Sequence, residues 1–256
     1  MKANNKIKAV VWIIGVLGLF VSAIVFAVLL HHQSPYYKSS KLIEAINNKN
    51  YTEVEAILST GVNPNIPEFR ITVINAFFEV APRLPLSVAC DNDDIEAVKM
   101  LIRYGATAEP MEGTDWSPLR KAIFSPGSNS LEIIIILLDN GADPYYVEGN
   151  SNAFFAAAEV PGHIQGEDIS ERSVAILDYM LVKYDETPTT IYQKEGKTLI
   201  SSSIGRTNNP TMVEYLIAQG DDVYSLFYGK DLYEIAKSEG KTDIARILEP
   251  YYNNVE

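Results

Sequence analysis

The chain contains one cysteine, Cys90, among its 256 residues. A single thiol cannot form an internal disulfide, and there is no second cysteine for a redox pair or a structural zinc site. Cys90 lies inside an apolar helical pattern, which predicts that it fills space in a core. The sequence therefore excludes a disulfide-stapled scaffold and thiol–disulfide chemistry.

Histidine is also scarce, with three residues at positions 31, 32 and 163. None stands beside a serine or cysteine on one rigid element, so no nucleophile has an imidazole partner. Gly196-Lys197-Thr198 resembles the end of a phosphate-binding loop, but Ile191 stands where that motif needs its first glycine. Asp221-Asp222 lacks the alternating spacing of a calcium loop. The sequence predicts a protein that is not an enzyme, with no catalytic, cofactor or metal site.

Basic residues are also few, with 21 Lys and Arg against 33 Asp and Glu. Three of the lysines precede residue 9, so the chain after residue 33 carries 18 basic and 33 acidic residues. Such a surface repels phosphate backbones and argues against nucleic acid as a partner. It suits a protein partner with a basic surface, although solubility alone explains the charge equally well.

The chain also contains one long apolar run. Ala9 to Leu30 contains 22 residues without a charge, and as a helix it spans about 33 Å, which matches the apolar core of a bilayer. The candidate cleavage site Val21-Ser22-Ala23 is followed by seven further apolar residues, unlike the end of a signal peptide. The run predicts an uncleaved transmembrane signal anchor over residues 9–30.

The charges on either side of this run predict its orientation. Lys2, Lys6 and Lys8 precede it, whereas His31, His32 and Gln33 follow it. By the positive-inside rule, residues 1–8 are expected in the cytoplasm and the C-terminal part outside it. We therefore expect a single-pass protein of the inner (plasma) membrane, with a linker at residues 31–38 and a periplasmic domain beyond it.

Residues 39–251 repeat two landmarks. The first is a turn, then leucine, then a small residue, as in SPLRKAI from Ser117. The second is an apolar helix ending in glycine, as in LEIIIILLDNGADPY. The second landmark ends at Gly61, Gly105, Gly141, Asp185 and Gly220, separated by 44, 36, 44 and 35 residues. This spacing fits a period near 33 with insertions.

These landmarks resemble the ankyrin family, whose T-P-L-H-x-A turn and G-A-D-x-N ending they echo. The resemblance implies an all-α solenoid of about six helix-turn-helix repeats, with a tail at residues 252–256. Proline at a first helical turn and glycine in a left-handed cap agree with it physically. Repeat four departs from the pattern, since Asn152-Ala153-Phe154 replaces the proline turn and Asp185 replaces the glycine.

Three segments exceed the period. Residues 66–83 are apolar enough to pack, and Phe77, Phe78 and Val80 are expected to close the core rather than contact a ligand. Residues 125–130 and 160–172 are expected to lengthen the turns inside repeats three and four.

The resemblance further implies that the turns between repeats project as fingers that bind a partner. The residues on these turns are acids and large apolar side chains, and aromatics are the residue types that anchor interfaces. Some of these rings are expected to fold back on a neighbouring finger. The candidate partner-binding residues are Met111, Glu112, Asp115, Trp116, Tyr145, Tyr146, Glu148, Tyr192, Tyr224, Phe227 and Tyr228, and Glu195 lies on the same turn as Tyr192.

The fold alone does not specify a function. A membrane-anchored acidic ankyrin domain is similar in architecture to bacterial immunity proteins that neutralise lipase effectors of type VI secretion. That resemblance implies a domain that caps a toxin in the periplasm. The alternative is an adaptor or scaffold for a periplasmic or envelope enzyme.

Overall fold

The computed structural model describes residue 22 and residues 34–68, 81–191 and 197–252. Within these ranges the chain forms twelve α-helices and two short β-hairpins. The helices are α2 Pro35–Asn47, α3 Tyr51–Ser59, α4 Pro85–Asp91, α5 Ile95–Arg103, α6 Pro118–Phe124, α7 Ser130–Asp139, α8 Ala153–Ala158, α9 Ser170–Lys183, α10 Leu199–Arg206, α11 Pro210–Ala218, α12 Leu232–Ser238 and α13 Thr242–Tyr252. The hairpins are β1 His163–Ile164 with β2 Glu167–Asp168, and β3 Leu226–Phe227 with β4 Lys230–Asp231.

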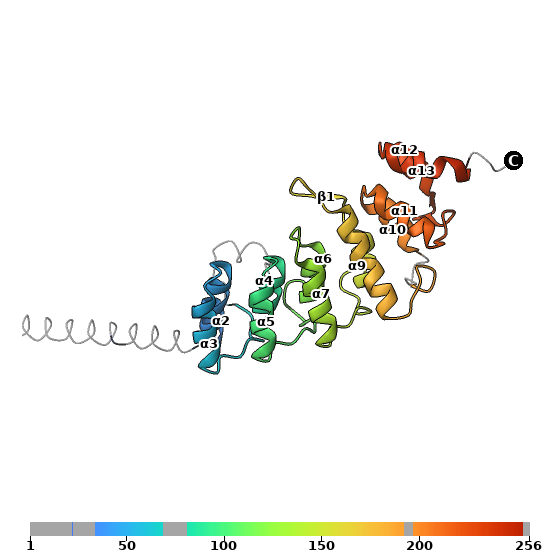
Figure 1. The fold of residues 1–256 in the computed structure, drawn as a ribbon. Helices are drawn as coiled ribbons and strands as arrows, with labels where there is room; N and C mark the ends of the chain where they lie inside the picture. The colour runs from blue at the N-terminus through green and yellow to red at the C-terminus, as the bar shows by residue number, and fades with distance from the viewer. Residues whose placement is uncertain (1–21, 23–33, 69–80, 192–196, 253–256) are drawn as a thin grey trace, which may run out of the picture.

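The twelve helices form six consecutive pairs that stand side by side in a row (Figure 1). Within a pair the two helices pack on each other, and each first helix also packs on the first helix of the next pair. The second helices from α3 to α13 form a parallel row of their own. The expected row of about six helix-turn-helix repeats is therefore confirmed, and the described chain is mostly helical, with two short hairpins that were not expected.

The helix starts follow from local sequence. Proline occupies the first turn of α2, α4, α6 and α11, where its missing N–H costs no intrahelical bond. In repeat four, which lacks that proline, the Asn152 side chain accepts a hydrogen bond from the Phe155 N–H and caps α8. The first helix begins at Pro35, four residues before the expected start of the repeats at 39, because this proline starts a helix inside the expected linker.

The helix ends agree with the second landmark. All five predicted end residues have positive φ, from +54° at Asp185 to +93° at Gly141. Asp185 therefore adopts the backbone conformation that glycine adopts in the other repeats, since aspartate tolerates the left-handed region better than most residues. Repeat four thus has a different residue at the end of its helix but the same left-handed backbone conformation there.

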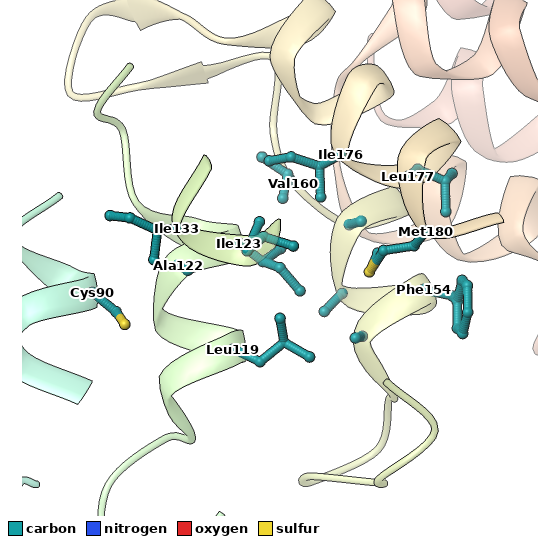
Figure 2. Packing of buried hydrophobic residues seen from close by; sticks show 14 of the residues in the cluster. Cys90, Leu119, Ala122, Ile123, Ile133, Phe154, Val160, Ile176, Leu177 and Met180 are labelled. Carbon is teal, nitrogen blue, oxygen red and sulfur yellow. The ribbon is translucent and has the colours of Figure 1, made fainter. Parts of the chain in front are cut away.

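The core runs through the row of helices without interruption. Figure 2 shows Cys90, Ala122 and Ile133 on one side of it and Phe154, Val160 and Met180 further along. Cys90 is fully buried and burial raises the pKa of its thiol, which confirms its role as core filler. Buried alanines such as Ala89 and Ala122 let the first helices approach closely.

Polar side chains connect neighbouring second helices along the outer side of the row. Each of the four junctions from α3 to α11 is bridged by one such contact between consecutive repeats. These contacts are Tyr51 Oη to Asp94 at 3.0 Å, Lys99 Nζ to Glu132 at 3.0 Å, Lys183 Nζ to Asp139 at 2.6 Å, and Tyr215 Oη to Asp178 at 2.8 Å. Repeats one to five are thus held to their neighbours by polar contacts as well as by the shared core.

Two of the three predicted insertions are described throughout, and the first one at its two ends. Residues 160–172 include the β1–β2 hairpin, and the loop at 125–130 is fixed by Arg172, which donates to the carbonyls of Ser125, Pro126 and Gly127. In the first insertion Arg83 forms an ion pair with Glu68 at 2.6 Å. Residues 69–80 lie outside the described residues, and with them Phe77, Phe78 and Val80.

The predicted membrane anchor also lies outside the described residues, except for Ser22. In the ranges that the structure describes, no helix combines the length and apolar character needed to cross a bilayer. The anchor and the orientation of the chain stay predictions.

Candidate functional site

The candidate partner-binding residues that the structure describes lie on the turns between helix pairs. We call three of these turns finger 2 (residues 104–117), finger 3 (140–152) and finger 5 (219–231), after the repeat that each one follows. Finger 4 spans 184–198, and its candidates Tyr192 and Glu195 lie outside the described residues. The structure places the other candidates on fingers 2, 3 and 5 of one row of repeats, with finger 4 between the last two.

In finger 2, the Trp116 side chain is exposed, yet neighbouring side chains hold it in place. Its ring lies 5.5 Å from the ring of Phe124, and the guanidinium carbon of Arg120 lies 4.8 Å from the Trp116 ring centroid. Such ring and cation contacts fix the orientation of a side chain that still shows one surface to solvent. Trp116 is therefore a preorganised aromatic surface.

The acids of finger 2 differ in their surroundings. Asp115 is half-buried and pairs with Lys121 Nζ at 2.8 Å. Burial opposes ionisation of Asp115, but hydrogen bonds from Lys121 and the Trp116 N–H outweigh burial, so the pKa of Asp115 is lowered. Glu112 is exposed and Met111 half-buried. Glu109 is exposed as well, so Glu109 and Glu112 are the acids of this finger that are open to a partner.

In finger 3, Tyr145 and Tyr146 are both exposed, but Tyr145 folds back on the next repeat. Its ring lies 5.3 Å from Phe154 and 5.8 Å from Tyr184, and its hydroxyl donates to Glu186 at 2.8 Å. Partial burial and the Glu186 carboxylate raise the pKa of Tyr145 to about 12. Tyr146 remains as the outward ring of this finger.

Glu148, also predicted to bind a partner, is engaged within the stack. Its carboxylate accepts hydrogen bonds from the Ser117 N–H at 2.8 Å and the Ser117 hydroxyl at 2.9 Å. Both carboxylate oxygens are therefore held by the same residue of the preceding finger. The structure therefore gives Glu148 a role in joining fingers 2 and 3.

In finger 5, Tyr224 and Tyr228 are exposed, whereas Phe227 turns inward. The Phe227 ring lies against Gly205 of α10, where an added Cβ would lie 2.3 Å from the ring. Leu226, which the sequence did not single out, is exposed in its place. The outward-facing apolar set of finger 5 is thus Tyr224, Leu226 and Tyr228. Val147 in finger 3 is a second exposed apolar residue that the sequence did not single out.

Charge on the fingers is strongly one-sided. Fingers 2, 3 and 5 together contain eight acidic residues and one basic residue, Lys230. Within the described ranges no group of three or more metal-ligating side chains occurs. The cavity between fingers 2 and 3 holds about 20 Å³, which is room for one water. The geometry presents a convoluted acidic and aromatic surface suited to binding another macromolecule.

A row of helix pairs joined by projecting turns is the architecture of a helical repeat solenoid, and comparison with known proteins identifies which one. Residues 42–147 match the family model for ankyrin repeats in three copies. The resemblance read from the sequence is confirmed, and residues 42–147 are ankyrin repeats.

Individual relatives agree with this assignment. A putative ankyrin repeat protein of Rickettsia bellii is 29% identical over 102 residues, which cover 40% of this chain and 27% of that protein. The chain thus matches little more than a quarter of that relative's length.

Two solved structures share the fold over almost their whole length. The crystal structure of the ankyrin repeat protein EF0377 is 23% identical, with a TM-score of 0.56, covering 82% of this chain and 97% of the other. A chain in the structure of the predatory endopeptidase Bd0816 from Bdellovibrio bacteriovorus in complex with the immunity protein Bd3460 is 17% identical. Its TM-score is 0.61, and the match covers 83% of this chain and 98% of that chain.

Proposed function

We propose that this chain is a membrane-tethered protein-binding module that neutralises a secreted antibacterial toxin by capturing it on fingers 2, 3 and 5. The single observation that carries the proposal is the composition of these fingers, with eight acids, one base and exposed rings at Trp116, Tyr146 and Tyr228. Acidic residues accelerate the association with a basic partner. Rigid aromatic rings anchor the bound partner and supply much of the binding energy.

Two further points support immunity over the adaptor role. The ankyrin fold recurs in the complex of an endopeptidase with its immunity protein, so a repeat stack of this size occurs in such an assembly. The apolar run at 9–30 would hold the domain at the inner membrane, facing the periplasm. A toxin that attacks the envelope, such as the lipase type implied by the sequence resemblance, would meet it there.

The test is protection of a cell. The gene next to this one would be expressed with a periplasmic signal, and survival measured with and without the full chain. The full chain should restore growth and should be recovered with the toxin from detergent-solubilised membranes. A neighbouring product that is not toxic, yet is recovered with the chain, would favour the adaptor role instead.

A surface variant makes the test specific to the fingers. Glu109→Lys, Glu112→Lys and Tyr146→Ala together change two exposed acids and one outward ring, while Asp115, Tyr145 and Glu148 keep their internal contacts. The matched control makes the same charge change on the second helices, with Glu55→Lys and Glu214→Lys. Protection should be lost with the finger variant and kept with the control. Equal protection by both would overturn the finger assignment.

A further inference from the structure

A cavity of about 190 Å³ lies in the first repeat, between the start of α2 and the turn that follows α3. This repeat stands at one end of the row of helix pairs (Figure 1). We call the cavity the α2 cavity, and it is lined by Pro35 and Lys38 of α2 and by residues 60–63 and 66 of the turn. It is far larger than the cavity between fingers 2 and 3, and it has room for a small polar group rather than for one water.

The charge of the α2 cavity is opposite to that of the whole chain. The chain carries a net charge of −12, yet the lining of the cavity contains one cation, the exposed Lys38, and no acid. Residues 34–43 hold two lysines and no acid, and residues 60–66 carry no charge. The α2 cavity therefore suits an anionic group, whereas the fingers suit a cationic one.

The acids closest to the α2 cavity in the sequence are paired within the chain. Glu44 forms an ion pair with Lys41 at 2.6 Å. Glu68, which is 7% exposed, pairs with Arg83 at 2.6 Å. Neither acid lines the cavity. An anion there would meet Lys38 without a carboxylate in the surrounding wall.

The walls of the α2 cavity are held in place. The buried Ser39 hydroxyl donates to the Ile66 carbonyl and ties the turn to α2. The side-chain oxygen of Asn63 accepts the Asn65 N–H at 2.9 Å, so its amide nitrogen is the half that can donate to a ligand. The Asn65 amide donates to the Gly105 carbonyl at 2.9 Å and ties the turn to the second repeat. A site ordered in this way loses little conformational entropy when a ligand binds.

The α2 cavity is also close along the chain to the predicted membrane anchor. The apolar run ends at Leu30 and α2 starts at Pro35, so the backbone between them can span at most about 18 Å. The polar headgroup layer is about 5–8 Å deep on each side of a bilayer. Tyr36, 50% exposed at the start of α2, is of a residue type enriched in that layer. An anchor that spans the bilayer would therefore bring the start of α2 to the headgroups.

We propose that the α2 cavity binds the phosphate group of a membrane phospholipid. Lys38 pairs with the phosphate, Asn63 donates a hydrogen bond to it, and Tyr36 lies among the neighbouring headgroups. This contact attaches the first repeat to the bilayer in addition to the anchor, and it restricts rotation of the repeats about the segment that follows the anchor. The inference rests on the membrane tether of the proposed function and adds a lipid-binding site to it.

The experiment counts lipids that stay bound to the full chain. Native mass spectrometry is recorded after release of the chain from dodecyl maltoside micelles that contain dioleoylphosphatidylethanolamine. Dioleoylglycerol, which has the same tails and no phosphate, is the comparison lipid and should be retained less. Lys38→Gln should lower the phospholipid affinity at least about tenfold, as expected for loss of a charge-assisted hydrogen bond. The matched control Lys237→Gln removes an exposed lysine of α12, in the last repeat, and should leave the affinity unchanged.

Three other outcomes would contradict the lipid site. Equal retention of the two lipids, or a phospholipid affinity unchanged by Lys38→Gln, would overturn the site and leave the tether in place. An adduct of inorganic phosphate that depends on Lys38, with no phospholipid retained, would replace the lipid with free phosphate. The tether is tested separately, by extraction of cell membranes with sodium carbonate. Release of the full chain by carbonate would overturn both the tether of the proposed function and the lipid site. Circular dichroism should show that every variant is folded.

Discussion

Glu148 of finger 3 holds both the N–H and the hydroxyl of Ser117, the residue that caps α6 one repeat earlier. Ser117 in turn accepts from the Arg120 N–H at 3.3 Å, so the start of the helix and the next finger share one hydrogen-bonded group. The contact makes the placement of each finger depend on the repeat before it, as nearest-neighbour coupling in a repeat stack requires.

Replacing Glu148 should therefore destabilise the stack. We expect Glu148→Ala to lower the free energy of unfolding by about 1–3 kcal/mol, because two partly buried donors on Ser117 lose their acceptor. Glu148→Gln, which keeps one acceptor oxygen, should lose less. Urea unfolding followed by circular dichroism measures the difference, and an unchanged midpoint for Glu148→Ala would show that water replaces the carboxylate without cost.

Gly205 should tolerate no side chain. Gly205→Ala places a Cβ 2.3 Å from the Phe227 ring, so finger 5 must move or the variant must lose about 1–3 kcal/mol of stability. Gly205→Ala combined with Phe227→Leu should recover part of this loss, since the smaller side chain makes room. Thermal unfolding of the single and double variants tests the coupling, and strictly additive losses would contradict the packing.

Asp185 marks a site where stability can be gained. Its φ of +54° is a conformation that glycine adopts without penalty. We expect Asp185→Gly to raise the free energy of unfolding by about 0.5–1 kcal/mol. Gly141→Ala, at the equivalent position with φ of +93°, should lower it. If Asp185→Gly destabilises the chain, the aspartate side chain contributes more than its backbone costs.

The raised pKa of Tyr145 predicts that the folded state loses stability at high pH. Its pKa is raised to about 12, first by partial burial and then by Glu186, whereas an unfolded tyrosine ionises near 10. The fold therefore favours the neutral phenol, and this contribution is complete below about pH 10 and lost as the pH rises through 12. Absorbance at about 295 nm should show this phenol among the last to ionise, and its step should be missing in Tyr145→Phe. An ordinary titration near pH 10 would contradict the contact with Glu186.

The repeat boundaries were readable from the sequence because they depend on short-range effects. Gly61, Gly105, Gly141, Asp185 and Gly220 all adopt the expected left-handed backbone. Asn152 caps its helix where a proline turn was missing, which explains why repeat four keeps its shape. Proline also placed one boundary elsewhere, since Pro35 starts α2 within the segment expected to be a linker.

The candidate site was less predictable. Residue type indicated which turns carry aromatics and acids, but not which of those side chains face outward. Phe227 and Leu226 are neighbours of similar apolar character, so composition cannot decide which is buried. The strand covers only these two residues, so no alternating pattern over a longer strand separates them either.

The sequence by itself determined the helix-pair repeat, its capping residues and the acidic, aromatic composition of its fingers. Each of these follows from backbone preferences and hydrogen bonds within a few residues. Only the tertiary structure decided that Phe227 packs inward on Gly205, that Leu226 is exposed and that Glu148 accepts hydrogen bonds from Ser117. These outcomes depend on contacts 22 residues away at Gly205 and 31 residues away at Ser117. The space and the donors there exist only once neighbouring repeats are stacked.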